Sequence, residues 1–197
     1  MAFINDQHYI NQIIEGNTNA FSVLVEQYKN LVFTLACKML KNREEAEEVS
    51  QDTFVKAFGS LHKFKGDSKF STWLYKITYN TCLDRLKKNK KKCDIVVAVE
   101  DFTDYQLKVI SDILDNIDEN YRNQRIQECL EMLPSEEAFL LTLYYFDDQS
   151  IEEIAKVIDC STNNVKIKLF RSRKKIASIL KDALEPEILD YYERKRR

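Results

Sequence analysis

Residues 150–176 read SIEEIAKVIDCSTNNVKIKLFRSRKKI, two short helical patterns separated by a tight turn. Ser150 and Glu153 have the spacing of a capping box, in which each side chain accepts a hydrogen bond from the other residue's backbone N–H. The helix that they open repeats apolar residues at steps of three and four: Ile151, Ile154, Ala155 and Ile158. The turn follows at Asp159-Cys160-Ser161. Two short helices joined by about three residues predict a helix-turn-helix.

The second helix of this unit, from about Thr162 past Leu180, is polar and basic on its outer face. The spacing of its apolar residues directs inward Val165, Leu169 and Ile176. A recognition helix places its first residues at base edges in the major groove and its later cations at phosphates. We therefore expect DNA contact from Ser161, Thr162, Asn163, Asn164, Lys166, Lys168, Arg171, Arg173 and Lys174. The alternative, strongest for Lys174 and Lys175, is an ordinary solvated face of a terminal helix.

The residues before the helix-turn-helix complete a helical domain that we place at 122–184, followed by a charged tail at 185–197. A helical pattern runs from residue 122 to 133, and Pro134 ends that helix and opens the next. Upstream, residues 94–120 carry eight Asp or Glu against one Lys. That composition is typical of a linker, which we place at 93–121.

The first part of the chain also has apolar residues at helical spacing, and we place a helical domain at 5–92. Long helices are expected at 20–40 and 43–61, and Ser71 is expected to cap a third. The third helix would turn to one side Trp73, Leu74, Ile77 and Thr81. Three glycines and two prolines in 197 residues are few, as in a mostly helical protein. The expected fold is all-α, with two helical domains joined by an acidic linker.

Residues 64–80 read FKGDSKFSTWLYKITYN, a lysine-flanked loop that runs straight into an aromatic helix. Gly66 permits a sharp turn, and the loop offers donors at Lys65, Ser68 and Lys69. Aromatic side chains lie on both sides of this loop, at Phe64, Phe70, Trp73, Tyr75 and Tyr79. A base stacked on such a ring gains about 1–3 kcal/mol without any sequence register, so this segment suits single-stranded DNA. The alternative is a loop–helix junction in which Phe70 and Trp73 only pack in a core.

The sequence contains no pattern for catalysis: no GxxxxGK[ST] loop, no GxSxG and no carboxylate pair beside a histidine. Its five cysteines are scattered without a CxxC pair, and its two histidines lie in no ligand spacing. We therefore expect no enzyme activity, no metal and no cofactor. The first residues lack a signal-peptide pattern, and no apolar run approaches the roughly 18 residues of a membrane span. A cytoplasmic protein without membrane insertion is expected.

Two motifs resemble one family. The phrase GDSKFSTWLYKI resembles the promoter-melting segment of the extracytoplasmic-function (ECF) sigma factors of bacterial RNA polymerase, and residues 122–180 resemble the promoter-binding fourth region of sigma factors. Asp159 stands where the family usually has Gly, but Asp tolerates the left-handed conformation of such a turn. Asn163-Asn164 replaces the usual Gly-Thr. That departure concerns the DNA sequence bound rather than the fold.

The resemblance implies a transcription initiation factor with core RNA polymerase, promoter DNA and an anti-sigma factor as partners. Polymerase docking would fall to Glu48, Gln51 and Asp52. Recognition and melting of the minus-ten element would fall to Lys65, Gly66, Asp67, Ser68, Phe70, Trp73, Lys76, Tyr79, Asn80, Arg85, Lys87 and Lys88. The recognition helix would bind the minus-thirty-five element, and the acidic linker would mimic nucleic acid within the polymerase.

Two other readings stay open at this point. A helix-turn-helix regulator that acts without core polymerase would explain the recognition helix, but it needs neither the loop at 65–70 nor the exposed Gln51 and Asp52. A helical protein-interaction module would leave the basic recognition helix without a purpose. A gel shift with and without core polymerase separates the three.

Overall fold

The computed structural model describes residues 6–88 and 118–184, and these form helices with no strand among them. The first half contains α1 (Asp6–Ile14), α2 (Phe21–Leu40), α3 (Arg43–Ser60) and α4 (Phe70–Lys88), with short 3-10 turns at Thr18–Ala20 and Leu61–Lys63. The all-α prediction is confirmed. The tail at 185–197 and most of the predicted linker lie outside the described residues.

The second half contains α6 (Glu119–Met132), α7 (Ser135–Tyr145), α8 (Ile151–Ile158) and α9 (Thr162–Ala183). Pro134 lies at the junction of α6 and α7, as predicted, and its carbonyl accepts the first hydrogen bonds of α7. The helix α8 buries Ile154, Ala155 and Val157, and the predicted Ile151 and Ile158 pack against the same core while partly buried. The predicted helix-turn-helix is therefore present.

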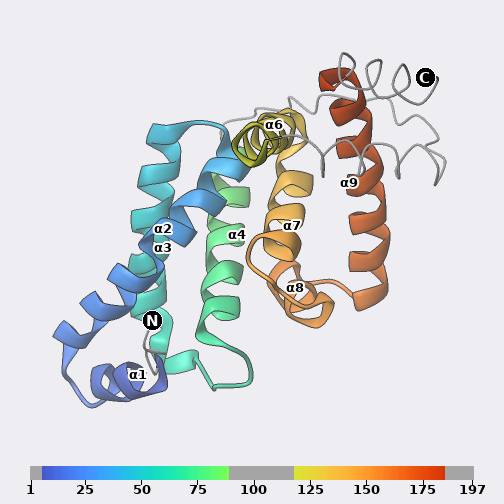
Figure 1. Cartoon of the computed structure of the whole chain (residues 1–197). Coiled ribbons are helices and arrows are strands. Elements are labelled where there is room, and N and C mark those ends of the chain that lie inside the picture. The colour runs from blue at the N-terminus through green and yellow to red at the C-terminus, as the bar shows by residue number, and fades with distance from the viewer. Residues whose placement is uncertain (1–5, 89–117, 185–197) are drawn as a thin grey trace, which may run out of the picture.

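The two halves pack against each other along two pairs of helices. In Figure 1, α2 and α4 of the first half lie beside α7 and α8 of the second, while α9 forms the outer edge. One apolar core runs through both halves, since Tyr75, Tyr79 and Cys82 of α4 belong to the same cluster as Phe139 and Leu143 of α7. Burial of the apolar side chains in this shared core holds the halves together.

A second, smaller core lies within the first half. It joins Ile10 of α1 to Leu24 of α2, Ala57 of α3 and Leu74 of α4. One local expectation was wrong here. Ser71 does not precede the third helix, because α4 already begins at Phe70.

Candidate nucleic-acid interface

The turn between α8 and α9 has the geometry that its residues predict. The Ser150 backbone N–H donates to Glu153 Oε2 at 2.9 Å, and the Glu153 N–H donates to Ser150 Oγ at 3.2 Å, which completes the capping box. Asp159 then takes the left-handed conformation, with φ of 56°. Ser161 caps α9, because its hydroxyl accepts from the Asn164 N–H at 3.3 Å. The N-terminus of α9 is thus fixed on a defined turn.

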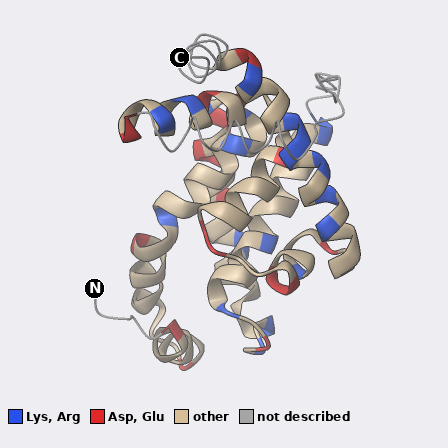
Figure 2. Ribbon diagram, turned by 45° about the vertical axis from the view of Figure 1, so that its right-hand side comes forward, with Lys and Arg blue, Asp and Glu red and all other residues tan. Residues whose placement is uncertain are grey.

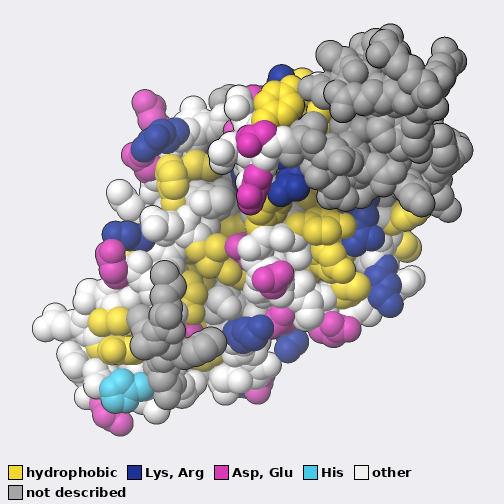
Figure 3. All heavy atoms as spheres, in the orientation of Figure 1, with side chains coloured by type: hydrophobic (Ala, Val, Ile, Leu, Met, Phe, Trp, Pro, Cys, Tyr) yellow, Lys and Arg dark blue, Asp and Glu magenta, His cyan; other side chains and the backbone are white. Residues whose placement is uncertain are grey.

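The outer face of α9 is exposed and basic, while Val165 and Leu169 are buried on the opposite face. Lys and Arg recur along α9 in Figure 2, and dark-blue side chains lie over it at the right-hand edge of Figure 3. Exposed side chains belong to Ser161, Thr162, Asn163, Asn164, Lys166, Lys168, Arg171 and Arg173, and Lys174 is half-buried. The structure thus brings the predicted recognition residues onto one helix with an accessible face.

Some of these cations already have partners. Lys168 Nζ lies 3.8 Å from Glu136 Oε2, an exposed pair that is worth little. The Arg173 guanidinium lies over the rings of Tyr144 and Tyr145, 5.3 and 5.5 Å from their centroids. Such cation–π contacts orient the side chain along α7. Arg173 is therefore held more firmly than an ordinary surface arginine.

Two exposed apolar residues on α9 were missing from the sequence prediction. Ile167 is 43% exposed and Phe170 is 56% exposed. An apolar side chain on a recognition helix can contact the methyl group of thymine, so both can take part in base reading. The signal for them was the helical phase: with Val165 and Leu169 inward, positions 167 and 170 fall outside.

The loop before α4 is turned at Gly66, whose φ is 79°, in the region that favours glycine. Lys65, Gly66 and Asp67 are exposed and Ser68 is partly so. The ring of Phe70, by contrast, is only 3% exposed. It packs at 5.5–5.7 Å from the rings of Tyr28, Phe64 and Trp73. In this arrangement Phe70 anchors the first turn of α4 and offers no face to a base.

The other predicted residues of α4 divide into two groups. Asn80, Lys87 and Lys88 are exposed. Tyr79 is buried, with its ring 5.1 Å from that of Phe139 on α7, and burial together with Glu136 raises the pKa of its hydroxyl. Lys76 is half-buried and Trp73 lies partly in the core. Of the predicted minus-ten residues on α4, some are therefore buried against the rest of the protein and others are exposed to solvent.

The predicted docking residues lie together on α3. Glu48, Gln51 and Asp52 are exposed, and the opposite face of α3 buries Val49 and Thr53. Arg85 of α4 reaches across to Glu48 Oε2 at 2.7 Å and lies 3.9 Å from Asp52 Oδ2. Hydrogen bonding to Glu48 raises the pKa of the Arg85 guanidinium.

Apolar side chains continue this face of α3. Val55 is 72% exposed, and Phe58 follows one turn later on the same side as Gln51. An exposed apolar stripe beside polar groups is a usual feature of protein interfaces. Sequence reasoning missed Val55 because a single valine among polar residues gives no periodic signal.

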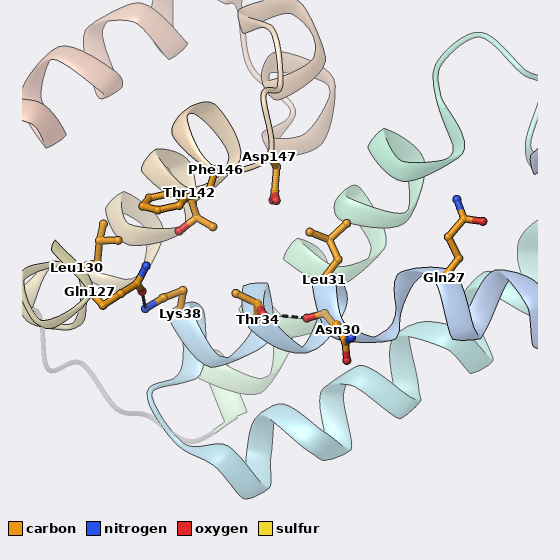
Figure 4. Close-up of a pocket in the computed structure, with 10 residues that line it drawn as sticks. All are labelled: Gln27, Asn30, Leu31, Thr34, Lys38, Gln127, Leu130, Thr142, Phe146 and Asp147. Atoms are coloured by element: carbon orange, nitrogen blue, oxygen red, sulfur yellow. Dashed lines mark hydrogen bonds between the residues drawn. The ribbon is translucent and has the colours of Figure 1, made fainter. Parts of the chain in front are cut away.

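A groove of about 360 Å³ lies between α2 and the C-terminal half, where it is lined by Leu31, Thr34, Leu130 and Phe146 among others. Figure 4 shows Asp147 pointing into it from the segment after α7, and Lys38 of α2 donating to Gln127 of α6. Burial and the neighbouring Asp148 raise the pKa of the Asp147 carboxyl to about 6.

Within residues 6–88 and 118–184 no three His, Cys, Asp or Glu side chains come together as ligands of a metal ion. In the same part of the chain, none of the helices has the length and apolarity required to span a bilayer.

The chain is similar to known proteins over most of its length. The family "Sigma-70 region 2" matches residues 24–92, and "Sigma-70, region 4" matches residues 123–176. The ECF RNA polymerase sigma factor SigW of Bacillus subtilis is 31% identical over 178 residues, which cover 88% of this chain and 95% of the relative. The RNA polymerase sigma-H factor of Pseudomonas aeruginosa is 31% identical over 184 residues, covering 91% and 95%.

Solved structures show the same fold. CnrH, solved in complex with the cytosolic domain of CnrY, has a TM-score of 0.58 at 23% identity and covers 90% of this chain and 97% of its own. The sigma factor RpoE of Bartonella quintana, solved with the anti-sigma factor NepR, has a TM-score of 0.57 at 20% identity, covering 82% and 96%. With both sigma regions in order and relatives matched nearly end to end, the chain belongs to the ECF sigma factors of bacterial RNA polymerase.

Proposed function

We propose that this sigma factor works through three surfaces: the exposed face of α3 for core polymerase, the loop at 65–70 with α4 for the minus-ten element, and the outer face of α9 for the minus-thirty-five element. The observation that carries the proposal is the separation of faces. On both α3 and α9 most of the predicted residues are exposed while the opposite face is buried, so the outer face of each helix is open to a partner.

The chemistry of each surface suits its partner. Gln51 and Asp52 supply donors and acceptors beside an apolar stripe, as at a protein interface. On α9, Asn163 and Asn164 can pair bidentately with adenine and Lys166 with guanine, while the later cations meet phosphates. A regulator that acts without polymerase is not favoured, because residues 24–92 match sigma region 2.

The docking surface is tested by replacing Gln51 with Ala and Asp52 with Arg. Core polymerase should no longer co-purify with the variant, and run-off transcription should fall to background, while helical circular dichroism is unchanged. The matched control is Asn11→Ala with Glu15→Arg, which makes similar changes at two exposed positions, one in α1 and one directly after it. Co-purification at wild-type yield by the α3 variant would remove the docking assignment.

We also place the protein in the cytoplasm, where core polymerase and the chromosome are, and expect an anti-sigma factor as a partner. The expectation of an anti-sigma factor is supported by the structure of RpoE of Bartonella quintana, which was solved in complex with the anti-sigma factor NepR. A protein that co-purifies with this chain from its host and abolishes run-off transcription in proportion to its concentration would be that partner. A chain that co-purifies with core polymerase alone under all growth conditions would contradict this expectation.

A further inference from the structure

The groove beside α2 carries chemistry that none of the three proposed surfaces uses. Its volume of about 360 Å³ lies in the range of small-molecule sites, which is about 300–1,000 Å³. The helix α2 forms one wall, and α6, α7 and the segment after α7 form the other (Figure 4). A hollow between packed helices is a usual place for a small ligand.

The walls of this groove offer apolar surface. Leu31 of α2 is partly buried, and Leu130 of α6 is 1% exposed. The ring of Phe146 is 50% exposed, although burial of such a ring is favourable. A ligand with a compact apolar body would cover these three side chains and remove apolar surface from water.

The carboxyl group of Asp147 points into the groove (Figure 4). Its Oδ2 atom is shut off from solvent, and it accepts no hydrogen bond from residues 6–88 or 118–184. Burial and the neighbouring Asp148 both raise the pKa of this carboxyl, so its charge is poorly compensated within the protein. A half-buried carboxylate attracts a cation more strongly than a fully solvated one, because the charges are screened less. An ammonium group at Asp147 would supply the missing charge.

The backbone around Asp147 holds the carboxyl group in place. The Asp147 N–H donates to the Thr142 carbonyl at 3.2 Å, and the Asp147 carbonyl accepts from Gln149 Nε2 at 2.9 Å. Gln149 is buried, and its own N–H donates to the Leu143 carbonyl at 2.9 Å. Little conformational entropy is therefore lost when a ligand pairs with this carboxyl.

Two hydroxyl groups that line the groove are available only as acceptors. The Thr142 hydroxyl donates to the Ala138 carbonyl at 2.8 Å. The Thr34 hydroxyl donates to the Asn30 carbonyl, also at 2.8 Å. Because each proton is already used, only the oxygen lone pairs remain for a ligand. Such a lining favours a head group with several donors, as an ammonium group has.

The remaining charge in the lining narrows the choice of ligand. Lys38 Nζ donates to Gln127 Oε1 at 2.7 Å, on the side of the groove formed by α6. A second positive charge on the ligand would be repelled there, so a monoamine is favoured over a diamine. A metal ion is not favoured either, because no three His, Cys, Asp or Glu side chains of the described ranges come together.

We propose that this groove binds a small organic amine, with its ammonium group at the Asp147 carboxyl and its alkyl or aryl body against Leu31, Leu130 and Phe146. The groove is separate from the exposed faces of α3 and α9 and from the loop at 65–70, so the proposal does not depend on the function assigned to them. Because the ligand would bind only the folded chain, it should also raise the unfolding temperature.

Three ligands that share a phenyl ring test the head group. At neutral pH 2-phenylethylamine is positive, 2-phenylethanol is neutral and phenylacetate is negative. Isothermal titration calorimetry on the full chain should show the amine binding about tenfold more tightly than the alcohol, and phenylacetate not binding. Intermolecular nuclear Overhauser effects should join the ring protons of the amine to the methyl groups of Leu31 and Leu130.

A pair of variants tests the carboxyl group. Asp147→Asn keeps the shape of the side chain and should weaken binding of 2-phenylethylamine about tenfold, because a charge-assisted hydrogen bond is lost. The matched control is Asp148→Asn, the same change of charge at the next residue, which is exposed. Asp148 has φ of 48°, a conformation that Asn tolerates, so this variant should fold and bind within about twofold of the wild type.

Several outcomes would overturn the proposal. They are equal affinity for the amine and the alcohol, an equal loss of affinity in the two variants, and no binding of the amine at millimolar concentration. Binding without Overhauser effects to Leu31 and Leu130 would place the amine elsewhere and would overturn it too. None of these outcomes changes the result of run-off transcription, so failure of this proposal and failure of the proposed function are distinguishable.

Discussion

The two surfaces assigned to DNA differ in what else their residues do. On α9 the polar residues at 161–164 contact little of the protein, and the face they share is open. On α4 the aromatic residues Phe70 and Tyr79 are buried, and the cations Lys69 and Lys76 pair with acidic groups of the other half. The face on α9 is open, whereas the face on α4 takes part in the packing of the two halves.

This difference shows that a residue type suited to a ligand does not establish an accessible site. An aromatic ring that can stack on a base can pack equally well against another aromatic ring of the protein, and Phe70 and Tyr79 do so here. Polar residues opposite a buried stripe have no such competing use. For α9 the chemistry therefore points to DNA, whereas for α4 it points both to DNA and to packing.

The largest difference in stability is expected between substitutions of a buried phenylalanine of α4 and an exposed phenylalanine of α9. Phe70→Ala removes a ring buried among three others and should lower the free energy of unfolding by about 3–5 kcal/mol. Phe170→Ala makes the same change at an exposed position of α9 and should cost less than about 0.5 kcal/mol. Urea unfolding followed by circular dichroism measures both. Equal losses would show that the contrast between the two helices is wrong.

The next effect concerns base reading by α9. Asn163→Ala and Asn164→Ala should leave unfolding unchanged and cost about 1–3 kcal/mol of discrimination at the base each residue reads. Promoters selected from a randomised upstream library should then differ between the wild type and each variant. Asn80→Ala on α4, also an exposed asparagine, should leave the upstream preference as it was. A single selected sequence for all four proteins would make α9 a positioning device only.

Much of the fold was readable because local signals agreed with one another. The capping box at Ser150, the left-handed turn at Asp159 and the break at Pro134 each have a local cause, and the structure has all three. The inward spacing of Val165 and Leu169 likewise follows from helical periodicity. Periodicity also predicted the exposed face of α9, whereas the α3 residues Glu48, Gln51 and Asp52 were named by the resemblance to sigma factors.

The packing of the two halves had no local signal. Treated alone, α4 needs one inward face, and Trp73, Leu74, Ile77 and Thr81 were expected there. The helix in fact lies between α2 and α3 on one side and α8 on the other, so Tyr75 and Tyr79 are buried as well. Two faces of one helix can be assigned only when the neighbour on each side is known, and that neighbour is distant in sequence.

A smaller effect should come from Asp147, which points into the groove between the halves. Its pKa of about 6 lies above the unfolded value of 3.8, so folding disfavours the charged carboxylate. Below pH 3.8 the carboxyl is protonated in both the folded and the unfolded state, so it does not change the free energy of unfolding. Above pH 6 it lowers that free energy by its full amount, so stability falls as pH rises through this window. Asp147→Asn should therefore raise the free energy of unfolding by about 1 kcal/mol at neutral pH, a value reduced because the side chain is partly exposed. Near the unfolded pKa the substitution should leave the free energy of unfolding unchanged.

Unfolding across the acid range measures this effect, with Asp84→Asn, at an exposed position of α4, as the control. The Asp84 variant should follow the wild-type pH profile, whereas the Asp147 variant should lack the fall between pH 3.8 and 6. Parallel profiles for the wild type and the Asp147 variant would mean that the carboxyl is solvated, and hence that the halves are apart in solution.

The smallest effect distinguishes two arginines of the open surface itself. Arg171 is exposed, and Arg171→Ala should reduce the slope of log affinity against log salt by about one for the phosphate it contacts. Arg173 lies over Tyr144 and Tyr145, so Arg173→Ala should change the slope less and instead cost about 0.5–1 kcal/mol of stability through the lost cation–π contact. Binding titrations of an upstream duplex at several salt concentrations, alongside unfolding curves, separate the two. If the slope falls by the same amount in both variants and stability in neither, Arg173 leaves the tyrosines for the phosphate, and the whole of this face serves DNA alone.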